Sequence, residues 1–451
     1  MTNDIFAARL ATRTGKSEAM FQEARQVLPG GVAANGKYMH PHPLYFQSAR
    51  GARVVDVDGN DYLDLLMGFG IHILGHAPQS IIEAVTASLH NGTMPGLATA
   101  LEVALAQKVR QHMPAMEMIR FVNTGSEATL MAMRVTRAYR RRNKIAKFEG
   151  NYNGQHDLVQ ISAVTSMGPP DAPQPSPDYL GIPASALSDV LILPYNDAQA
   201  AADLLAKHAD ELAAVIIEPV SAYGLGCVPA DPEFLRALRQ ITREHDIPLI
   251  FDEVVTNLRL GLGGACALYG ITPDLVCLGK IVGGGFPIGA YGGRQDLMER
   301  FVAPTGKASD NTEKMYQSGT FSGNAVTMAA GLAAIRALEQ AGVYEYVNDL
   351  TARLCAGLDG LAEEHGIQMM TTSVKSMFQV HFGVPVIRNM RDKLKEDLFS
   401  AAVFARGLLV NEVYAPAHTL FLSTAHTQQD VDRVLNVAES VLVEMKAHRP
   451  G

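Results

Sequence analysis

The stretch TPDLVCLGKIVGGG, residues 272–285, contains the features on which the predicted fold depends. Its apolar run, Leu275 to Leu278, predicts a short buried strand, and the glycines that follow predict a flexible loop. Lys280 therefore lies at a strand end, between apolar neighbours. Because desolvation disfavours a charged amine, this lysine is a candidate nucleophile toward a carbonyl group, which is the chemistry of a Schiff base. The alternative is a surface lysine in a glycine-rich turn.

Strand-like and helix-like segments alternate through the middle of the chain. Short apolar runs predict seven strands, at 119–122, 145–148, 190–193, 214–217, 249–251, 275–278 and 288–291. Helical patterns fit between several of them, notably at 198–209 and 232–245. This alternation predicts an α/β fold with a mostly parallel sheet covered by helices on both faces. Functional side chains are expected at the carboxyl ends of the strands.

Different patterns flank this region. Residues 3–28 have helical spacing, and the turn signal Asp58-Gly59 between two apolar runs predicts a hairpin. Toward the C-terminus, a helix at 345–365 and a strand at 377–382 predict a smaller α+β domain. The expected organisation is an N-terminal helix and substrate-facing segment at 1–55, a large domain at 56–325 and a small C-terminal domain at 326–451.

Composition favours a globular enzyme without a nucleic-acid partner. Hydrophobic residues make up 47% of the chain and charged residues 19%, which is typical of globular proteins. The net charge of −8 provides no basic footprint for nucleic acid. No apolar run is long enough for a membrane span, and the N-terminal segment lacks the apolar region of a secretory signal, so we expect a cytoplasmic protein.

Neither metal nor disulfide chemistry is indicated. The cysteines are widely spaced and form no CxxC pair. His72 and His76 have the spacing of metal ligands on a helix, but the glycines and proline around them argue against a helix there. The segment GGVAANGKY is similar to a phosphate-binding loop, yet Tyr38 replaces the Ser or Thr that would bind Mg²⁺. We therefore expect no metal site and no nucleotide site.

Polar residues also follow other predicted strands. Asp252 ends the run PLIFD, so its carboxylate is expected at the same sheet edge as Lys280. Thr124 opens a predicted helix, is spaced from Glu127 as in a capping box, and precedes N–H groups suited to a phosphate. Tyr152 offers an aromatic face. A nucleophilic lysine, a buried carboxylate, a phosphate site and an aromatic ring together indicate pyridoxal 5′-phosphate (PLP), with Asp252 keeping the ring nitrogen protonated.

A series of sequence blocks identifies the family. In chain order they are LPGGV, DVDGNDYLD, RFVNTGSEAT, KFEGNY, IIEPV, LIFDEV, TPDLVCLGK, GGGFPIGAYGGR, APTG and SGTFSGN. With these blocks the chain resembles the class III PLP-dependent aminotransferases, and within them the glutamate-1-semialdehyde 2,1-aminomutase branch. The resemblance implies fold type I and a homodimer whose active sites are shared between the two chains.

The resemblance also implies a role for each cofactor-side residue. Lys280 forms the Schiff base, and Asp252 partners the pyridine nitrogen. Val254 packs under the ring and Tyr152 stacks above it. The implied phosphate ligands are Gly125, Ser126 and, from the neighbouring chain, Thr320.

On the substrate side the chain departs from the aminomutase branch. Lys37 stands where the branch has the arginine of NSPVR, and a lysine offers a point charge in place of a bidentate fork. Phe69 replaces a tryptophan, Tyr223 an asparagine and His418 a glutamate. Together with Tyr38, these residues predict a substrate amine that is larger and more apolar or aromatic than the glutamate semialdehyde of the aminomutase branch.

Retained cofactor residues with altered substrate residues favour a change of substrate. We expect a PLP-dependent aminotransferase that moves an amino group between an amine or amino acid and a carbonyl acceptor, in two half-reactions through pyridoxamine phosphate. The alternative is the aminomutase itself, whose intramolecular transfer gives 5-aminolevulinate. A non-catalytic scaffold is a third hypothesis, against which the presence of Lys280, Asp252 and Tyr152 argues.

Overall fold

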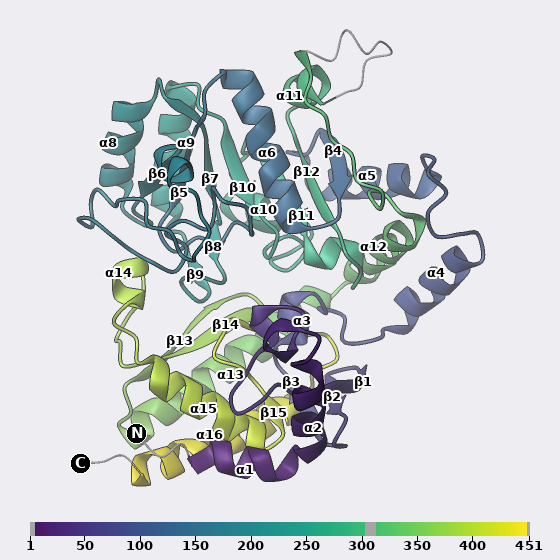
Figure 1. The fold of residues 1–451 in the computed structure, drawn as a ribbon, viewed down its shortest axis with the longest axis vertical. Helices are drawn as coiled ribbons and strands as arrows, with labels where there is room; N and C mark the ends of the chain where they lie inside the picture. The colour runs from purple at the N-terminus through teal and green to yellow at the C-terminus, as the bar shows by residue number, and fades with distance from the viewer. Residues whose placement is uncertain (1–4, 303–312, 449–451) are drawn as a thin grey trace. The chain divides into compact units, whose positions relative to one another are not determined.

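A computed structural model describes residues 5–302 and 313–448, so the motif APTG at 303–306 lies outside the described residues. The chain divides into two compact units (Figure 1). The central unit comprises Gln79–Tyr344 and Val386–Lys395. The terminal unit comprises the described residues up to Pro78, then Glu345–Pro385 and the described residues from Glu396 onward. These divisions differ from the predicted boundaries near residues 55 and 325.

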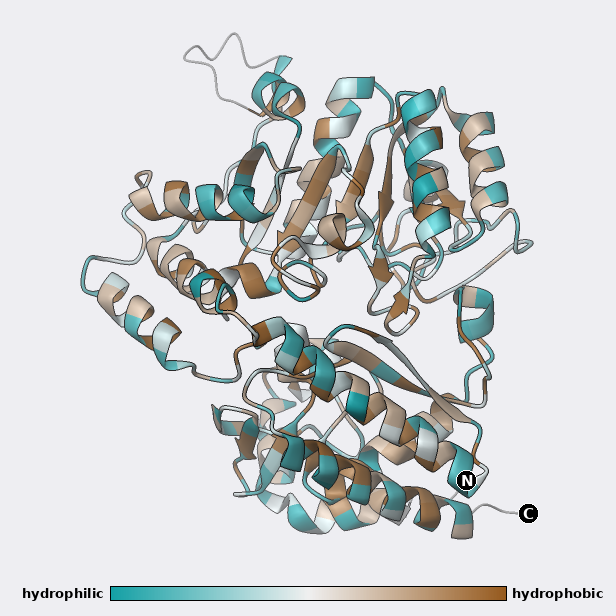
Figure 2. Ribbon diagram, turned by 180° about the vertical axis from the view of Figure 1, so that it is seen from behind, coloured by the Kyte–Doolittle hydropathy of each residue, from teal (hydrophilic) through white to brown (hydrophobic). Residues whose placement is uncertain are grey.

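A seven-stranded sheet forms the core of the central unit. Its order is β4 (Met118–Val122), β12 (Gly289–Gly293), β11 (Leu275–Gly279), β10 (Leu249–Asp252), β7 (Leu212–Ile217), β5 (Lys144–Phe148) and β6 (Val190–Leu193). Strand β12 runs antiparallel to both neighbours, and the other pairs are parallel. The predicted mostly parallel sheet is confirmed, and its strands are largely brown, that is apolar, in Figure 2.

Helices of the central unit pack around this sheet. Helix α6 (Gly125–Arg140) buries Ala128, Met131 and Val135 in one apolar cluster with strand residues such as Ile250 and Cys277. The other helices are α4 (Gln79–Leu89), α5 (Ala100–His112), α7 (Ala184–Ser188), α8 (Ala198–His208), α9 (Pro232–Glu244), α10 (Gly264–Tyr269), α11 (Gln295–Phe301), α12 (Ala325–Leu338) and α14 (Met390–Lys393). Two short strands, β8 (Val220–Ser221) and β9 (Val228–Pro229), form a separate pair.

The terminal unit joins both ends of the described chain in one core. Its sheets are β1 (Phe46–Arg50), β2 (Arg53–Asp56), β3 (Asp61–Asp64) with β15 (Val413–Tyr414), and β13 (Met369–Val374), β14 (Met377–Phe382) with β16 (Leu420–Phe421). Its main helices are α1 (Ile5–Arg13), α2 (Gly15–Ala24), α3 (Met67–Gly70), α13 (Val343–His365), α15 (Leu398–Val410) and α16 (Gln428–Ala447). Phe6 and Leu10 share a cluster with Phe404 and Val441. The N-terminal helix therefore belongs to the same unit as the C-terminal elements.

The prediction of a single helix at 3–28 is wrong in one respect, because two helices, α1 and α2, are separated by a break at Thr14. Thr14 is buried, and its Oγ1 donates to the Leu10 carbonyl at 2.8 Å and contacts His42 Nε2 at 2.8 Å. The predicted hairpin forms between β2 and β3. Among the described residues, no helix has both the length and the apolar character needed to cross a membrane.

Candidate active site

Lys280 and Asp252 lie at the same edge of the seven-stranded sheet. Strands β10 and β11 are parallel neighbours, and in their register Asp252 pairs with Cys277. Lys280 follows β11 directly after Gly279. Both residues therefore lie at the carboxyl ends of adjacent strands, which is where open α/β sheets bind ligands.

The carboxylate of Asp252 is buried, with only 4% of the residue exposed, and it accepts two hydrogen bonds. Asn153 Nδ2 donates to Oδ2 at 2.9 Å, and the Val254 backbone N–H donates to Oδ1 at 3.1 Å. Burial raises the pKa of Asp252 above its ordinary value, while these hydrogen bonds and the Lys280 amine oppose the rise. Burial therefore favours the protonated acid, whereas the two hydrogen bonds and the Lys280 amine favour the carboxylate.

Lys280 provides an amine at this edge. Burial lowers its pKa below the ordinary lysine value, while the charges of Asp252 and Glu218 act in the opposite direction. The backbone of Lys280 has a φ of +51°, in the left-handed region that is strained for a side-chain-bearing residue. A partly desolvated amine in a fixed position is the form of lysine that attacks carbonyl groups.

A second buried acid, Glu218, was not among the residues predicted from the sequence. Glu218 follows β7 and is 3% exposed. Its Oε2 accepts the Tyr152 backbone N–H at 2.8 Å, and its own N–H donates to Asn151 Oδ1 at 2.8 Å. The signal was present in IIEPV, where an acid follows an apolar run as Asp252 does in PLIFD.

The start of helix α6 provides a site for an anion. A Cβ atom at Gly125 would come within 2.7 Å of Val254 Cγ1, so only a glycine lets the helix start pack this closely against Val254. Ser126 Oγ accepts the Gln155 backbone N–H at 3.1 Å, which ties the helix start to the loop that carries Tyr152. The N–H groups and the dipole of a helix N-terminus favour a phosphate.

The predicted capping box at this helix forms only in part. Thr124 Oγ1 accepts the Glu127 backbone N–H at 3.1 Å, as expected. Glu127 Oε2 accepts the backbone N–H of Asn123 at 2.6 Å instead of that of Thr124. The side chain therefore reaches one residue further back and still satisfies an N–H group before the helix.

Val254 lies between the helix start and the end of β11. A Cβ atom at Gly279 would lie 3.1 Å from Val254 Cγ1, and one at Gly125 would lie closer still. Thr320 is exposed and lies before α12, and its contact with a neighbouring chain stays a prediction.

Of the predicted substrate residues, Tyr223 is the one in the central unit. Its ring centroid lies 5.0 Å from that of Tyr152, with 52° between the ring planes, and 43% of the residue is exposed. Lys37, Tyr38 and Phe69 belong to the terminal unit, where Lys37 and Tyr38 are exposed. Their role toward a substrate stays a prediction.

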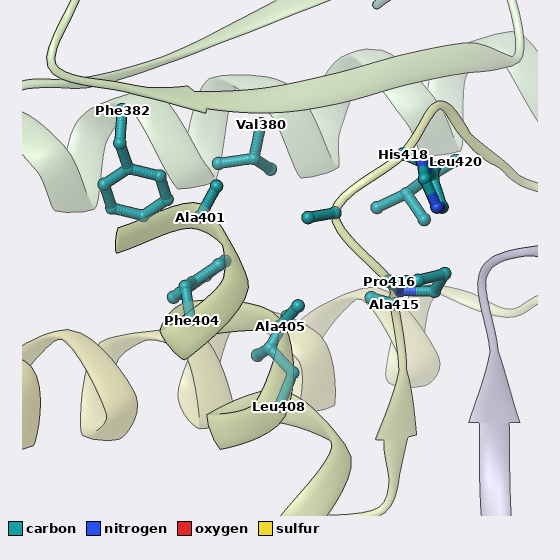
Figure 3. Close-up of a pocket in the computed structure, with 11 residues that line it drawn as sticks. Val380, Phe382, Ala401, Phe404, Ala405, Leu408, Ala415, Pro416, His418 and Leu420 are labelled. Atoms are coloured by element: carbon teal, nitrogen blue, oxygen red, sulfur yellow. The ribbon is translucent and has the colours of Figure 1, made fainter. Parts of the chain in front are cut away.

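His418, also in the terminal unit, lies at the side of an apolar pocket (Figure 3). The lining residues are Val380, Phe382, Ala401, Phe404, Ala405, Leu408, Ala415, Pro416, Ala417, His418 and Leu420. The cavity volume is about 20 Å³, which is close to the minimum that a single water needs. This pocket is therefore too small for a substrate, and the substrate role of His418 stays a prediction.

Comparison with known proteins identifies the family. The sequence profile described as Aminotransferase class-III matches residues 34–442. The chain belongs to this family. It is 42% identical to the glutamate-1-semialdehyde 2,1-aminomutase of Methanopyrus kandleri over 433 residues, which cover 95% of this chain and 97% of that protein.

Relatives of this class III family member whose structures have been solved share its fold. An omega-transaminase from Sphaerobacter thermophilus superposes with a TM-score of 0.89 at 35% identity, covering 95% of this chain and 98% of that one. A transaminase with bound PLP superposes with a TM-score of 0.86 at 30% identity, covering 96% and 98%. The seven-stranded sheet and the helices around it are therefore those of a PLP-dependent fold type I enzyme.

Proposed function

We propose that this class III aminotransferase moves an amino group on PLP, and that its reaction is the intramolecular one of glutamate-1-semialdehyde 2,1-aminomutase. The observation that carries amino transfer is the placement of Lys280 and Asp252 at the carboxyl ends of adjacent strands. The specific reaction is supported by the name of a relative that is 42% identical over 95% of the chain.

The described residues fit the cofactor. Gly125 and Gly279 let the helix start and the end of β11 pack closely against Val254, and a helix start suited to phosphate lies there. The cofactor is PLP, which supplies an electron-withdrawing ring that stabilises negative charge on the substrate carbon bearing the amine. In this proposal the residues that hold the cofactor are Gly125, Ser126, Tyr152, Asp252, Val254, Lys280 and, from the second chain of a homodimer, Thr320.

Three residues of the chain would have separate roles in the reaction. Asp252, as a carboxylate, holds a proton at the ring nitrogen. Lys280 Nζ would hold the cofactor at its carbonyl carbon, and its free amine would accept a proton from the substrate carbon and later return one. Tyr152 orients the ring by stacking on it.

The test is to supply glutamate-1-semialdehyde to the purified enzyme without any amino acceptor. Rapid formation of 5-aminolevulinate, lost in Lys280→Ala, supports the proposal. An enzyme that binds PLP but forms no 5-aminolevulinate contradicts the specific reaction.

A second candidate is an aminotransferase acting between a separate donor and acceptor. The observation in its favour is Tyr223, which replaces an asparagine of the aminomutase branch and places an aromatic ring 5.0 Å from that of Tyr152. Lys37 in place of an arginine also weakens recognition of a substrate carboxylate. Following the absorbance of bound cofactor across a panel of amines distinguishes the two. Conversion by aromatic amines, reversed only by an added oxo acid, supports the aminotransferase.

A further inference from the structure

The loop at residues 151–153 is attached at three successive points to the ends of two strands. Asn151 Oδ1 accepts the Glu218 N–H, and the Tyr152 N–H donates to Glu218 Oε2, both at 2.8 Å. Asn153 Nδ2 donates to Asp252 Oδ2 at 2.9 Å. The backbone that carries the Tyr152 ring is therefore held by two buried acids, of which only Asp252 has an expected contact with the cofactor.

We propose that Glu218 is a positioning residue of the active site, whose side-chain oxygen fixes the backbone of Tyr152 and thereby the orientation of its ring over PLP. This inference rests on the proposed function, in which Tyr152 stacks on the cofactor. Glu218 is itself fixed, since its carbonyl accepts the Tyr195 hydroxyl at 3.1 Å. With 3% of Glu218 exposed, water has little access to replace its oxygen.

The surroundings of Glu218 act on its ionisation in both directions. Burial, and then the negative charge of Asp252, raise the pKa of Glu218 well above its ordinary value, although the backbone N–H groups of Tyr152 and Ala222, and then Lys280, oppose the rise. The other ionisable groups on which its charge would act are Lys147, Tyr152 and Tyr195. Because a protonated glutamate and a glutamine have the same shape, Glu218→Gln keeps the acceptor for the Tyr152 N–H.

The test compares Glu218→Gln with Glu218→Leu. The two substitutions have similar volumes and both remove the acid, but only glutamine offers an oxygen to Tyr152. The dissociation constant for PLP is measured by titrating apoprotein, and the visible circular dichroism of the bound cofactor reports the orientation of its ring. We expect E218Q to bind PLP within about threefold of wild type, and E218L to bind it about tenfold more weakly, the effect of losing one hydrogen bond, with a smaller dichroism signal.

Glu149 provides a matched control. It follows β5, the strand next to β7, is 2% exposed, and pairs with Arg391 at 2.8 Å without contacting Tyr152 through a described hydrogen bond. E149L is expected to lower the melting temperature while leaving the PLP dissociation constant and the dichroism unchanged. If E218L does not fold, E218D makes the same comparison, because it draws the oxygen back by one methylene.

Two results would overturn the inference. One is an E218L protein (or E218D, if E218L does not fold) that binds PLP with wild-type affinity and dichroism. The other is an E218Q protein as impaired as E218L, since the acid and not the acceptor would then be what matters. Wild-type protein that shows no absorbance from lysine-bound PLP would instead refute the proposed function, so the two failures are distinguishable.

Discussion

Replacing Asn153 with alanine is expected to make Asp252 harder to ionise. Asn153 is 1% exposed, and its amide is one of the donors that oppose the effect of burial on the pKa of Asp252. A hydrogen bond to a charged group contributes about 1.5–3 kcal/mol. Since one pKa unit corresponds to about 1.4 kcal/mol, the pKa of Asp252 is expected to rise by roughly one to two units. The carboxylate is the form that holds the ring nitrogen protonated. In the variant we therefore expect acidification to protonate Asp252, and so reduce activity, at a higher pH than in wild type.

The acid limb of the pH profile of kcat/KM measures this change. We expect the limb in N153A to lie roughly one to two pH units above that of wild type. Asn60→Ala is the matched control, because Asn60 Nδ2 also donates to a carboxylate, Asp56 Oδ2, at 2.9 Å, but in the terminal unit. An N153A protein with wild-type melting temperature and an unmoved acid limb would refute the reasoning.

Three further predictions concern the cofactor site. Lys280→Ala is expected to slow amino transfer by at least roughly 10²–10⁴-fold, from the loss of proton transfer alone, and a small added amine should restore part of the rate in a steady-state assay. Gly125→Ala places a methyl group 2.7 Å from Val254 Cγ1, so PLP titration should show weaker binding, because Val254 or the start of α6 has to shift. If the homodimer shares its sites, co-purified hybrids of Lys280→Ala and Thr320→Ala chains should contain one wild-type site per dimer. Hybrids without such a site would contradict the sharing.

The strands of the central sheet are predictable from the sequence for a physical reason. Strands covered on both faces are continuous apolar runs, and β7 and β11 are buried along their whole length. Asp252 and Lys280 end or follow such runs, so their common edge follows once the strands are parallel. The direction of β12 does not follow, because an apolar run carries no information about the direction of its neighbours.

Other features depend on contacts between residues distant in sequence. At the break between α1 and α2, Thr14 contacts His42, and nothing in the helical spacing of residues 3–28 encodes that partner. Phe6 and Leu10 have the expected helical pattern. Their packing against the C-terminal elements depends on tertiary contacts, which this pattern does not encode. The bond from Tyr152 to Glu218 uses a backbone N–H, which has no sequence signature at all.

Buried ionisable groups at this edge of the sheet act on one another. Asp252, Glu218 and Lys280 are two acids and one amine, and an unpaired buried charge is costly. The charge of Asp252 adds to the effect of burial in raising the pKa of Glu218, whereas the Lys280 amine opposes the rise at both acids. The two acids in turn oppose the effect of burial on the pKa of Lys280. Loss of the Lys280 amine therefore disfavours the charged form of both acids, which links the ionisation of the predicted nucleophile to that of the acid expected at the ring nitrogen.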